Sequence, residues 1–263
     1  MRSDRPGGSR SGDKEGSTIS PTPPTREHRQ DPSADQIALP SNLVRTGIVL
    51  RSRSLRDCDP AESDVVSQPG FPRHASAIRQ REFAAGRICA ASAMRDLGSM
   101  SYPVDVAQDR SPIWPAGLLG SISHTSELAA AVVARSSPQV RAVGLDLEQA
   151  VALEDDLIDE ICIPREREWL ATQPKQRRGL LAKAVFCAKE AAYKCQYSLT
   201  GEMFGFETFE TALFLDRGSF SAKFLKKTGC FARGDRLDGH IWMAADHFVA
   251  LVISAGMPAT ADA

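Results

Sequence analysis

The sequence lacks any uninterrupted apolar run that approaches the roughly 20 residues of a membrane-spanning helix. Its N-terminus also lacks the hydrophobic core of a secretory signal peptide, so we expect no stable membrane insertion and a cytoplasmic location. The formal net charge is only −1 over 263 residues, which argues against attraction of the whole surface to nucleic acid or to an anionic membrane. What remains is a globular chain of ordinary composition that is long enough to bury a core.

The six cysteines form no CxxC pair, and none of their spacings is typical of a zinc site. They are scattered along the chain among small apolar residues. We therefore expect free and mostly buried thiols in a reducing compartment, in preference to disulfides.

Bulky apolar residues are almost absent from residues 1–40, which are rich in Ser, Pro, Gly and Arg. Such a segment cannot bury enough surface to offset the entropy lost on ordering, so we predict a disordered tail. A regulatory tail and an extension without function are both compatible with this composition. Ordered structure is expected from residue 41 onward.

Past residue 40 the sequence predicts a mixture of strands and helices. A helix is expected from Arg73 to Leu97, and Gly98 follows it as the residue that ends a helix in a left-handed conformation. The segment SPIWPAGLLGS, residues 111–121, is predicted to be a loop. Strands are expected over residues 42–52, in short extended runs over 121–135 with 128–134 buried, and over 140–150.

The second part of the chain is predicted to contain a long helix over residues 178–196 and short helices over 153–162 and 164–173. The apolar stripe of the long helix consists of Leu181, Val185, Ala188, Ala192 and Cys195. Strands are expected over 209–215, 219–225 and 239–255. Helices mixed with mainly antiparallel strands, in two successive halves, indicate an α+β fold.

Two acidic residues stand at alternate positions in AVGLDLE, residues 142–148. In a strand, Asp146 and Glu148 lie on the face opposite Val143, Leu145 and Leu147. Two carboxylates on one face can both bind a hard cation through oxygen. An isolated D-x-E is also compatible with a strand face whose acids are merely solvated.

A third acid, Glu190, lies in FCAKEAAYK, residues 186–194, and Lys194 follows it at i+4. One interpretation is an ion pair that stabilises the helix by roughly 0.2–0.5 kcal/mol. The other makes Glu190 a third oxygen ligand of a magnesium ion, with Lys194 next to the negative charge of a substrate phosphate.

Further polar and basic residues could bind an anion. Ser123 and His124 lie in GSISH, where a hydroxyl, an imidazole and backbone amides can hydrogen-bond phosphate; a single histidine at a strand end can equally be structural. Arg79 and Arg87 are eight residues apart on the predicted helix, hence within about 80° of each other around it. Arg110 lies in the following loop. Arginines in such positions are either solvated or part of an anion site.

Three segments together resemble the 4′-phosphopantetheinyl transferase superfamily, in particular its enterobactin synthase component D-like branch. These segments are WPAGLLGSISHT (114–125), VGLDLE (143–148) and FCAKEAAYK (186–194). Each is a weak signal alone, whereas the three in this order are specific. The helix REFAAGRICAASAM also resembles the arginine-bearing helix of the family, and the resemblance covers residues 75–255. Phe186 stands where the surfactin-synthetase-type branch has Trp.

The resemblance implies an enzyme that transfers 4′-phosphopantetheine from coenzyme A to a serine of an acyl or peptidyl carrier protein, releasing adenosine 3′,5′-bisphosphate. It implies Mg²⁺ bound by Asp146, Glu148 and Glu190, with Glu148 acting through a water. Lys194 would contact the coenzyme A phosphates. Glu190, directly or through a metal-bound water, is the candidate for accepting the serine proton, and its role as base or only as metal ligand stays open. The remaining coenzyme A contacts that it implies are Arg79, Arg87, Arg110, Ser123 and His124.

The family fold implies two similar α+β halves related by a pseudo-two-fold, with coenzyme A between them. We expect the halves to span residues 41–145 and 146–263 of a monomer, and the carrier to belong to siderophore, nonribosomal peptide or polyketide synthesis. Two other functions stay open. A different magnesium-dependent phosphohydrolase would not need the GSISH segment, and a non-catalytic binder of coenzyme A or carrier protein should have lost one of the three acids.

Overall fold

The computed structural model describes residues 37–44, 47–62, 64–68, 70–100 and 103–255. The chain divides into the unit Met1–Asp31 and the unit Pro32–Ala263, and everything that follows concerns the second unit. Residues 1–36 of the expected tail lie outside the described residues. Ile37 is buried and donates its backbone N–H to Oγ of Ser52 at 2.9 Å, so packed structure begins before residue 41.

The first sheet has three antiparallel strands in the order β1-β5-β4. Their bounds are β1 Ile48–Ser54, β4 Leu118–His124 and β5 Leu128–Arg135. The strand predicted over 42–52 starts later than expected, because residues 41–44 form a turn and Gly47 has a positive φ of 70°. The segment 111–121, expected to be a loop, contains the short strand β3, Pro112–Ile113, and the beginning of β4.

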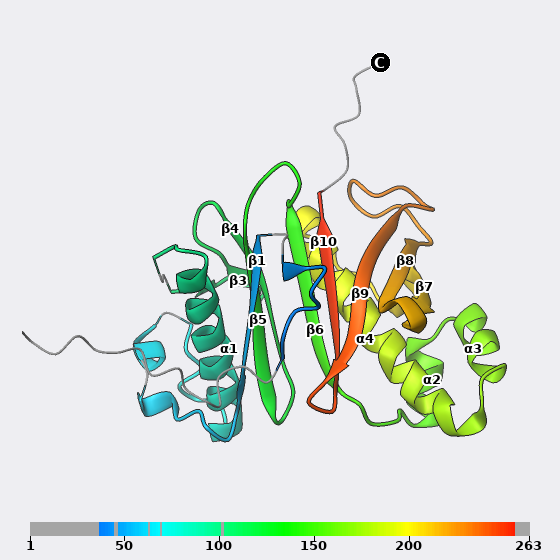
Figure 1. The fold of residues 1–263 in the computed structure, drawn as a ribbon, viewed down its shortest axis with the longest axis horizontal. Coiled ribbons are helices and arrows are strands. Elements are labelled where there is room, and N and C mark those ends of the chain that lie inside the picture. The colour runs from blue at the N-terminus through cyan, green and yellow to red at the C-terminus, as the bar shows by residue number, and fades with distance from the viewer. Residues whose placement is uncertain (1–36, 45–46, 63, 69, 101–102, 256–263) are drawn as a thin grey trace, which may run out of the picture. The chain divides into compact units, whose positions relative to one another are not determined.

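Helix α1, Ala77–Asp96, covers one face of the first sheet (Figure 1). It begins four residues after the predicted start because Ser76 caps it, accepting the backbone N–H of Arg79 at 3.3 Å. The helix ends as predicted, at Leu97, and Gly98 has a φ of +66°.

The second sheet has five antiparallel strands in the order β6-β10-β9-β8-β7. Their bounds are β6 Ala142–Gln149, β7 Phe209–Phe214, β8 Ser219–Phe224, β9 Arg236–Ala244 and β10 His247–Ser254. The predicted long helix is α4, Lys175–Thr200, which is preceded by α2, Asp155–Ile161, and α3, Pro164–Ala171. Helix α4 lies along the second sheet in Figure 1.

Three apolar clusters arrange these elements in layers. Alternate residues of β5, such as Ala131 and Val133, pack with α1, whereas Val132 packs with Leu145 and Leu251 of the second sheet. The opposite face of the second sheet packs against α4. The order is therefore α1, first sheet, second sheet, α4, which confirms the α+β prediction. Strand β5 is buried on both faces, which explains its continuous apolar run.

The face assignment predicted for β6 is confirmed. Val143, Leu145 and Leu147 contribute to the cluster between the two sheets, so the alternate residues, including Asp146, face α4. The boundary expected between residues 145 and 146 falls inside β6, whose eight residues all pair with β10. The chain passes from the first sheet to the second between Arg135 and Ala142.

Gly144 allows α4 to approach β6 closely. A Cβ atom at this position would lie 2.0 Å from the carbonyl oxygen of Ala191 and 2.6 Å from the backbone nitrogen of Cys195. Only a residue without a side chain fits there. This close approach places Asp146, two residues further along β6, beside Lys194 of α4.

Two sequence-based expectations about the surface and the cysteines can be compared with the structure. No helix among the described residues is long and apolar enough to cross a membrane. Cys58, Cys162, Cys187 and Cys195 are buried thiols and Cys230 is an exposed one, in agreement with the expectation that the cysteines are mostly buried.

Candidate active site

The centre of the candidate site is a buried contact between β4, β6 and α4. Nζ of Lys194 donates to Oδ1 of Asp146 at 2.7 Å and to Oγ of Ser123 at 3.1 Å. Ser123 donates to the same Asp146 oxygen at 2.9 Å. The structure therefore brings together three of the residues that the sequence singled out, from positions 23 and 48 residues apart.

Two serines of β4 join the two sheets at this point. Strand β4 is an edge of the first sheet and β6 is an edge of the second, so some backbone groups of β6 have no strand partner. The hydroxyls of Ser121 and Ser123 accept the N–H groups of Leu145 and Leu147 at 3.0 and 3.2 Å. The alternating serines of GSISH thus fix β6 in place, and Ser123 reaches Asp146 from that position.

Asp146 has one carboxylate oxygen without a partner. The residue is 3% exposed, and its Oδ2 is buried with no hydrogen bond to any part of the chain that the structure describes. A buried anionic oxygen in this state is costly unless a cation or a donor reaches it. This atom is the first sign of a ligand at the site.

Glu190 lies one turn before Lys194 on α4, and its carboxylate makes no hydrogen bond or ion pair with any described residue. Burial raises its pKa to about 6; repulsion by Asp146 and Glu148 adds to the shift, and the charge of Lys194 opposes it. Glu190 is therefore an acid whose charge is poorly compensated and whose proton exchanges near neutral pH.

Glu148, the third predicted metal ligand, is turned toward a different lysine. Its Oε2 accepts from Nζ of Lys183 on α4 at 3.1 Å. Burial and the charge of Asp146 raise the pKa of Glu148, and Lys183 opposes this. The three acids repel one another electrostatically, but within the described ranges no three His, Cys, Asp or Glu side chains form a group that could hold a metal ion.

Lys194 is held in its charged form by the surrounding acids. Burial alone would lower its pKa, but the attraction and hydrogen bond of Asp146, together with the charge of Glu190, outweigh burial and raise the pKa. A lysine that stays protonated at this depth is suited to bind phosphate oxygens.

His124 ends β4 beside the arginine-bearing helix. Its Nε2 lies 2.8 Å from a guanidinium nitrogen of Arg79, which can only donate, so Nε2 must be the unprotonated nitrogen. Glu82 lies 3.8 Å from the other ring nitrogen. Burial lowers the pKa of His124, Glu82 opposes this, and the charges of Arg79 and Lys194 lower it further. His124 is therefore a neutral imidazole.

The three predicted arginines line one cavity of about 320 Å³. Arg79 and Arg87 enter it from α1 and Arg110 from the loop between β2, Asp105–Val106, and β3. Arg87 lies over the ring of Phe83, with its guanidinium carbon 4.2 Å from the ring centroid. Burial, reinforced by the charge of Arg79, lowers the pKa of Arg87 to about 10. The lowered pKa shows that the positive charge of Arg87 is unfavourable where it is buried beside Arg79. A cluster of three cations is typical of an anion site.

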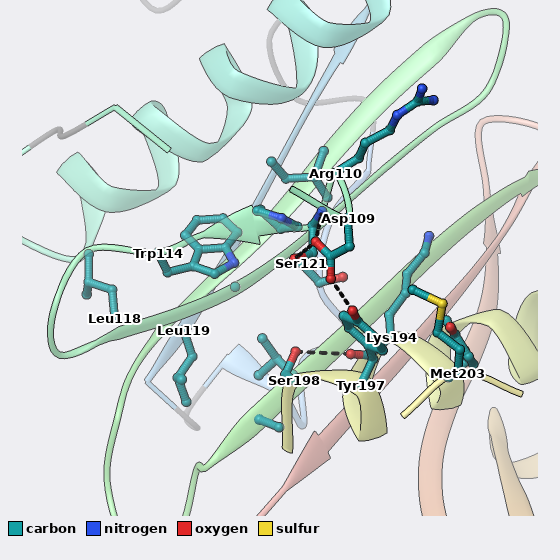
Figure 2. Close-up of a pocket in the computed structure, with 17 residues that line it drawn as sticks. Asp109, Arg110, Trp114, Leu118, Leu119, Ser121, Lys194, Tyr197, Ser198 and Met203 are labelled. Atoms are coloured by element: carbon teal, nitrogen blue, oxygen red, sulfur yellow. Dashed lines mark hydrogen bonds between the residues drawn. The ribbon is translucent and has the colours of Figure 1, made fainter. Parts of the chain in front are cut away.

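A larger cavity of about 560 Å³ lies between β3 and β4 on one side and α4 on the other (Figure 2). Lys194 and Arg110 both line it, so it reaches from the Asp146 cluster to the arginine-lined cavity. Trp114 forms part of its wall; the indole ring packs where a Cβ atom of Gly120 would lie at 2.4 Å. This explains why the WPAGLLGSISH segment combines a tryptophan with glycine.

Several residues of the site were not identified from the sequence. Tyr193, Tyr197 and Asp109 line the larger cavity, and Lys183 pairs with Glu148. The tyrosines had a detectable signal, since they lie three and seven residues after Glu190 and so on the same side of the helix. Asp109 had none, because its position depends on how a loop folds across to α4.

Lys189, the neighbour of Glu190, is not part of the cavity between the halves. It is 1% exposed and pairs with Glu166 at 2.7 Å. Its Nζ also donates to the carbonyl oxygens of Ile161 and Phe206 at 2.9 and 3.0 Å. Lys189 thus anchors α4 to the segments around α2 and α3, while Lys194 lines the larger cavity. Glu190 lines a smaller adjoining pocket together with Lys189 and Tyr193.

Two family models match the chain. Residues 67–134 match the 4′-phosphopantetheinyl transferase N-terminal domain, and residues 142–250 match the 4′-phosphopantetheinyl transferase superfamily. The first match ends within β5 and the second begins at β6, where the structure passes from one sheet to the other. The matched regions contain every predicted site residue.

Named relatives agree with these models. The chain is 34% identical over 198 residues to the 4′-phosphopantetheinyl transferase Svp of Streptomyces mobaraensis, covering 72% of this chain and 80% of the relative. It is 33% identical to the 4′-phosphopantetheinyl transferase Npt of Nocardia iowensis, covering 67% and 82%. Identity to enterobactin synthase component D of Escherichia coli K12 is 36%, over 52% of this chain and 66% of the relative. The chain belongs to the 4′-phosphopantetheinyl transferase superfamily.

Proposed function

We propose that this chain transfers 4′-phosphopantetheine from coenzyme A to a serine hydroxyl of an acyl or peptidyl carrier protein and releases adenosine 3′,5′-bisphosphate. The observation that carries this proposal is the ion pair of Lys194 with Asp146. Its lysine lines a large cavity, and that cavity continues to three clustered arginines through Arg110. One end supplies groups for a reacting pyrophosphate, and the other supplies cations for a distant phosphate. Coenzyme A has both features.

The arginine-lined cavity binds the 3′-phosphate end of coenzyme A. Arg79, Arg87 and Arg110 together provide donors that a phosphate can accept in pairs. The neutral His124, which accepts a hydrogen bond from Arg79, keeps its Nδ1–H available as a further donor toward the phosphates. Such binding energy, realised far from the reacting atoms, holds the pyrophosphate in position for attack.

The site also fits a divalent cation. Among the described residues, Oδ2 of Asp146 is buried without a hydrogen-bond partner, and the Glu190 carboxylate makes no hydrogen bond or ion pair. Mg²⁺ is commonly held by one or two carboxylates together with substrate phosphates and waters. Asp146 and Glu190 would hold it here, with Glu148 contributing through a water. When bound, the ion would neutralise charge on the pyrophosphate oxygens.

Residues of this chain then account for the proton and the leaving group. Glu190, with its pKa of about 6, accepts the proton of the carrier serine as its oxygen forms a bond to the phosphorus that carries pantetheine. The bond from that phosphorus to the bridging oxygen breaks. Lys194 stabilises the negative charge left on adenosine 3′,5′-bisphosphate. The nucleophile comes from the partner protein, so the enzyme needs no serine triad of its own.

The assembly, location and pathway belong to the same proposal. One chain supplies both walls of the cavity, which supports a monomer. We place this monomer in the cytoplasm. Its relatives include a protein named enterobactin synthase component D, which favours carriers of siderophore or related nonribosomal peptide and polyketide synthesis.

The test is mass spectrometry of apo carrier proteins incubated with this enzyme, coenzyme A and Mg²⁺. We expect a carrier to gain the mass of one phosphopantetheine group and to lose this gain when its acceptor serine is replaced by alanine. Absence of the added mass with peptidyl, polyketide and fatty-acid carriers alike would reject the transferase assignment. Release of inorganic phosphate without carrier modification would instead favour a phosphohydrolase.

A further inference from the structure

The loop that carries Arg110 belongs to an isolated hairpin. Strands β2 and β3 pair only with each other among the described strands, through Asp105 with Ile113 and Val106 with Pro112. A two-stranded hairpin is marginally stable by itself in water. The base of this hairpin is fixed by Val106, which packs against an apolar cluster that includes Phe83 and Ala84 of α1. Its tip therefore needs a separate anchor.

The tip is anchored to the other half of the molecule. The phenol of Tyr197, on α4, donates a hydrogen bond to Oδ2 of Asp109 (Figure 2). The other carboxylate oxygen of Asp109 accepts the backbone N–H of Ser111 at 2.9 Å and its hydroxyl at 2.7 Å. Asp109 thus closes the turn at the tip and at the same time joins the turn to α4 across the larger cavity.

Arg110 depends on this anchoring. It has a φ of +71°, a left-handed conformation that costs a residue other than glycine about 1–3 kcal/mol and persists only where the surroundings enforce it. Figure 2 shows Asp109 directed at Tyr197, with the Arg110 side chain extending away from that contact. Arg110 lines both the larger cavity and the arginine-lined cavity.

We propose that the hydrogen bond between Asp109 and Tyr197 is a positioning contact that sets the preference of the enzyme for coenzyme A over 3′-dephospho-coenzyme A. It holds the hairpin tip so that Arg110 completes the cluster with Arg79 and Arg87. This inference rests on the proposed function, because it requires that the arginine cluster binds the 3′-phosphate. Asp109 and Tyr197 act through Arg110 and are therefore positioning residues.

The chemistry of the pair suits a permanent contact. The hydrogen bonds from Tyr197 and Ser111 lower the pKa of Asp109 to about 2, so the acceptor is an anion throughout the range in which proteins work. Tyr197 is also stacked on Tyr193, with ring centroids 6.0 Å apart, which restricts the rotation of its side chain. A rigid donor and a charged acceptor restrict the tip better than a neutral pair.

Calorimetric titration of the full chain with coenzyme A and with 3′-dephospho-coenzyme A tests the proposal. We expect Tyr197→Phe and Asp109→Asn to weaken coenzyme A binding by roughly fivefold to tenfold, the size expected for the loss of one solvent-accessible hydrogen bond. The affinity for 3′-dephospho-coenzyme A should stay unchanged. In an Arg110→Ala background, Tyr197→Phe should cause no further loss, because the contact acts through Arg110.

Asp59→Asn is the matched control. Asp59 is an exposed aspartate that accepts a backbone N–H within its own turn, from Ala61 at 2.9 Å, and it lines neither cavity. The control should bind both ligands as the wild type does. The proposal is overturned if Tyr197→Phe keeps the wild-type preference, or if it weakens both ligands equally, as a merely structural role would.

The outcome for the wild type separates this inference from the proposed function. A wild-type enzyme that modifies a carrier protein while Tyr197→Phe keeps full preference for the 3′-phosphate refutes only the positioning contact. A wild-type enzyme that shows no preference between the two ligands refutes the assignment of the arginine cluster and the positioning contact with it. Failure of the wild type to modify any carrier refutes the proposed function itself.

Discussion

Nζ of Lys194 lies 2.7 Å from Oδ1 of Asp146, while Oδ2 of the same carboxylate is buried and has no hydrogen-bond partner in the described part of the chain. The two oxygens therefore have different tasks. Oδ1 fixes the lysine and, through Ser123, the seam between the sheets. The negative charge at Oδ2 is not compensated by any hydrogen bond from the described residues. This unequal compensation is the feature on which the proposed cation site rests.

Asp146→Asn should abolish transfer by removing the charge that Oδ2 offers to a cation. The amide has the same shape and can still accept from Lys194, so the fold should persist. We expect the rate of carrier modification to fall by at least about 100-fold, as when one electrostatic stabiliser of a transition state is removed. Calorimetry with Mg²⁺ and coenzyme A should show weaker metal binding. Near-normal turnover with an unchanged Mg²⁺ requirement would rule out Asp146 as a ligand.

Glu190→Gln should make the metal-free protein more stable at neutral pH while it eliminates transfer. The folded protein holds the Glu190 proton more tightly than the unfolded chain, since the pKa rises from 4.5 to about 6. Stability from this group is thus greatest below pH 4.5 and declines as pH rises through 6. With partial solvent screening, the loss at pH 7 amounts to about 1–2 kcal/mol.

Urea unfolding of the wild type and Glu190→Gln in EDTA, between pH 4.5 and 7.5, measures this effect. The variant should lose the part of the pH dependence that belongs to Glu190 and should gain stability at the upper end. An identical pH profile for the two proteins would show that the surroundings of Glu190 do not raise its pKa. Carrier modification by the variant at a wild-type rate would show that it is neither base nor ligand.

The buried pair of Lys189 and Glu166 should be strongly coupled. Glu166 accepts the N–H of Thr211 at 2.6 Å and that of Ile163 at 2.9 Å, besides the ion pair with Lys189. Lys189→Met alone leaves a buried carboxylate uncompensated, which should cost about 3–5 kcal/mol. Adding Glu166→Gln should recover part of that loss. Additive losses in a double-mutant cycle, measured by chemical denaturation, would contradict the coupling.

The sequence predicted the structure correctly where the periodicity of apolar residues within one strand or helix defines which side is buried. The alternation in β6 predicted the face on which Asp146 lies, opposite the apolar residues of the strand. The apolar stripe of α4 predicted residues that the structure packs into apolar clusters. The sequence did not predict contacts between residues that are far apart along the chain. Nothing in the letters indicates that Glu148 turns to Lys183, that Lys189 is buried, or that Asp109 reaches Tyr197.

The start of α1 shows why even a well-formed helix can be misplaced by a few residues. The composition of residues 73–76 is compatible with helix, but the hydroxyl of Ser76 caps the N–H of Arg79 and so places the first helical residue at Ala77. Local competition between a cap and one more turn is decided by a single hydrogen bond. Periodicity does not detect it.

Gly144→Ala should separate α4 from β6 and so damage both stability and catalysis. The added Cβ would lie 2.0 Å from a backbone oxygen of α4, and backbone cannot move aside as a flexible side chain can. We expect a loss of at least about 3 kcal/mol, at the upper end for overpacking of a core. Gly98→Ala is the control: Gly98 has a positive φ but open space around it, so it should cost only about 1 kcal/mol.

Thermal unfolding compares the two variants. Carrier modification by the folded fraction of Gly144→Ala should be slowed as well, because Lys194 and Glu190 move away from Asp146. A Gly144→Ala protein as stable and active as Gly98→Ala would mean that the close approach of α4 does not position the site.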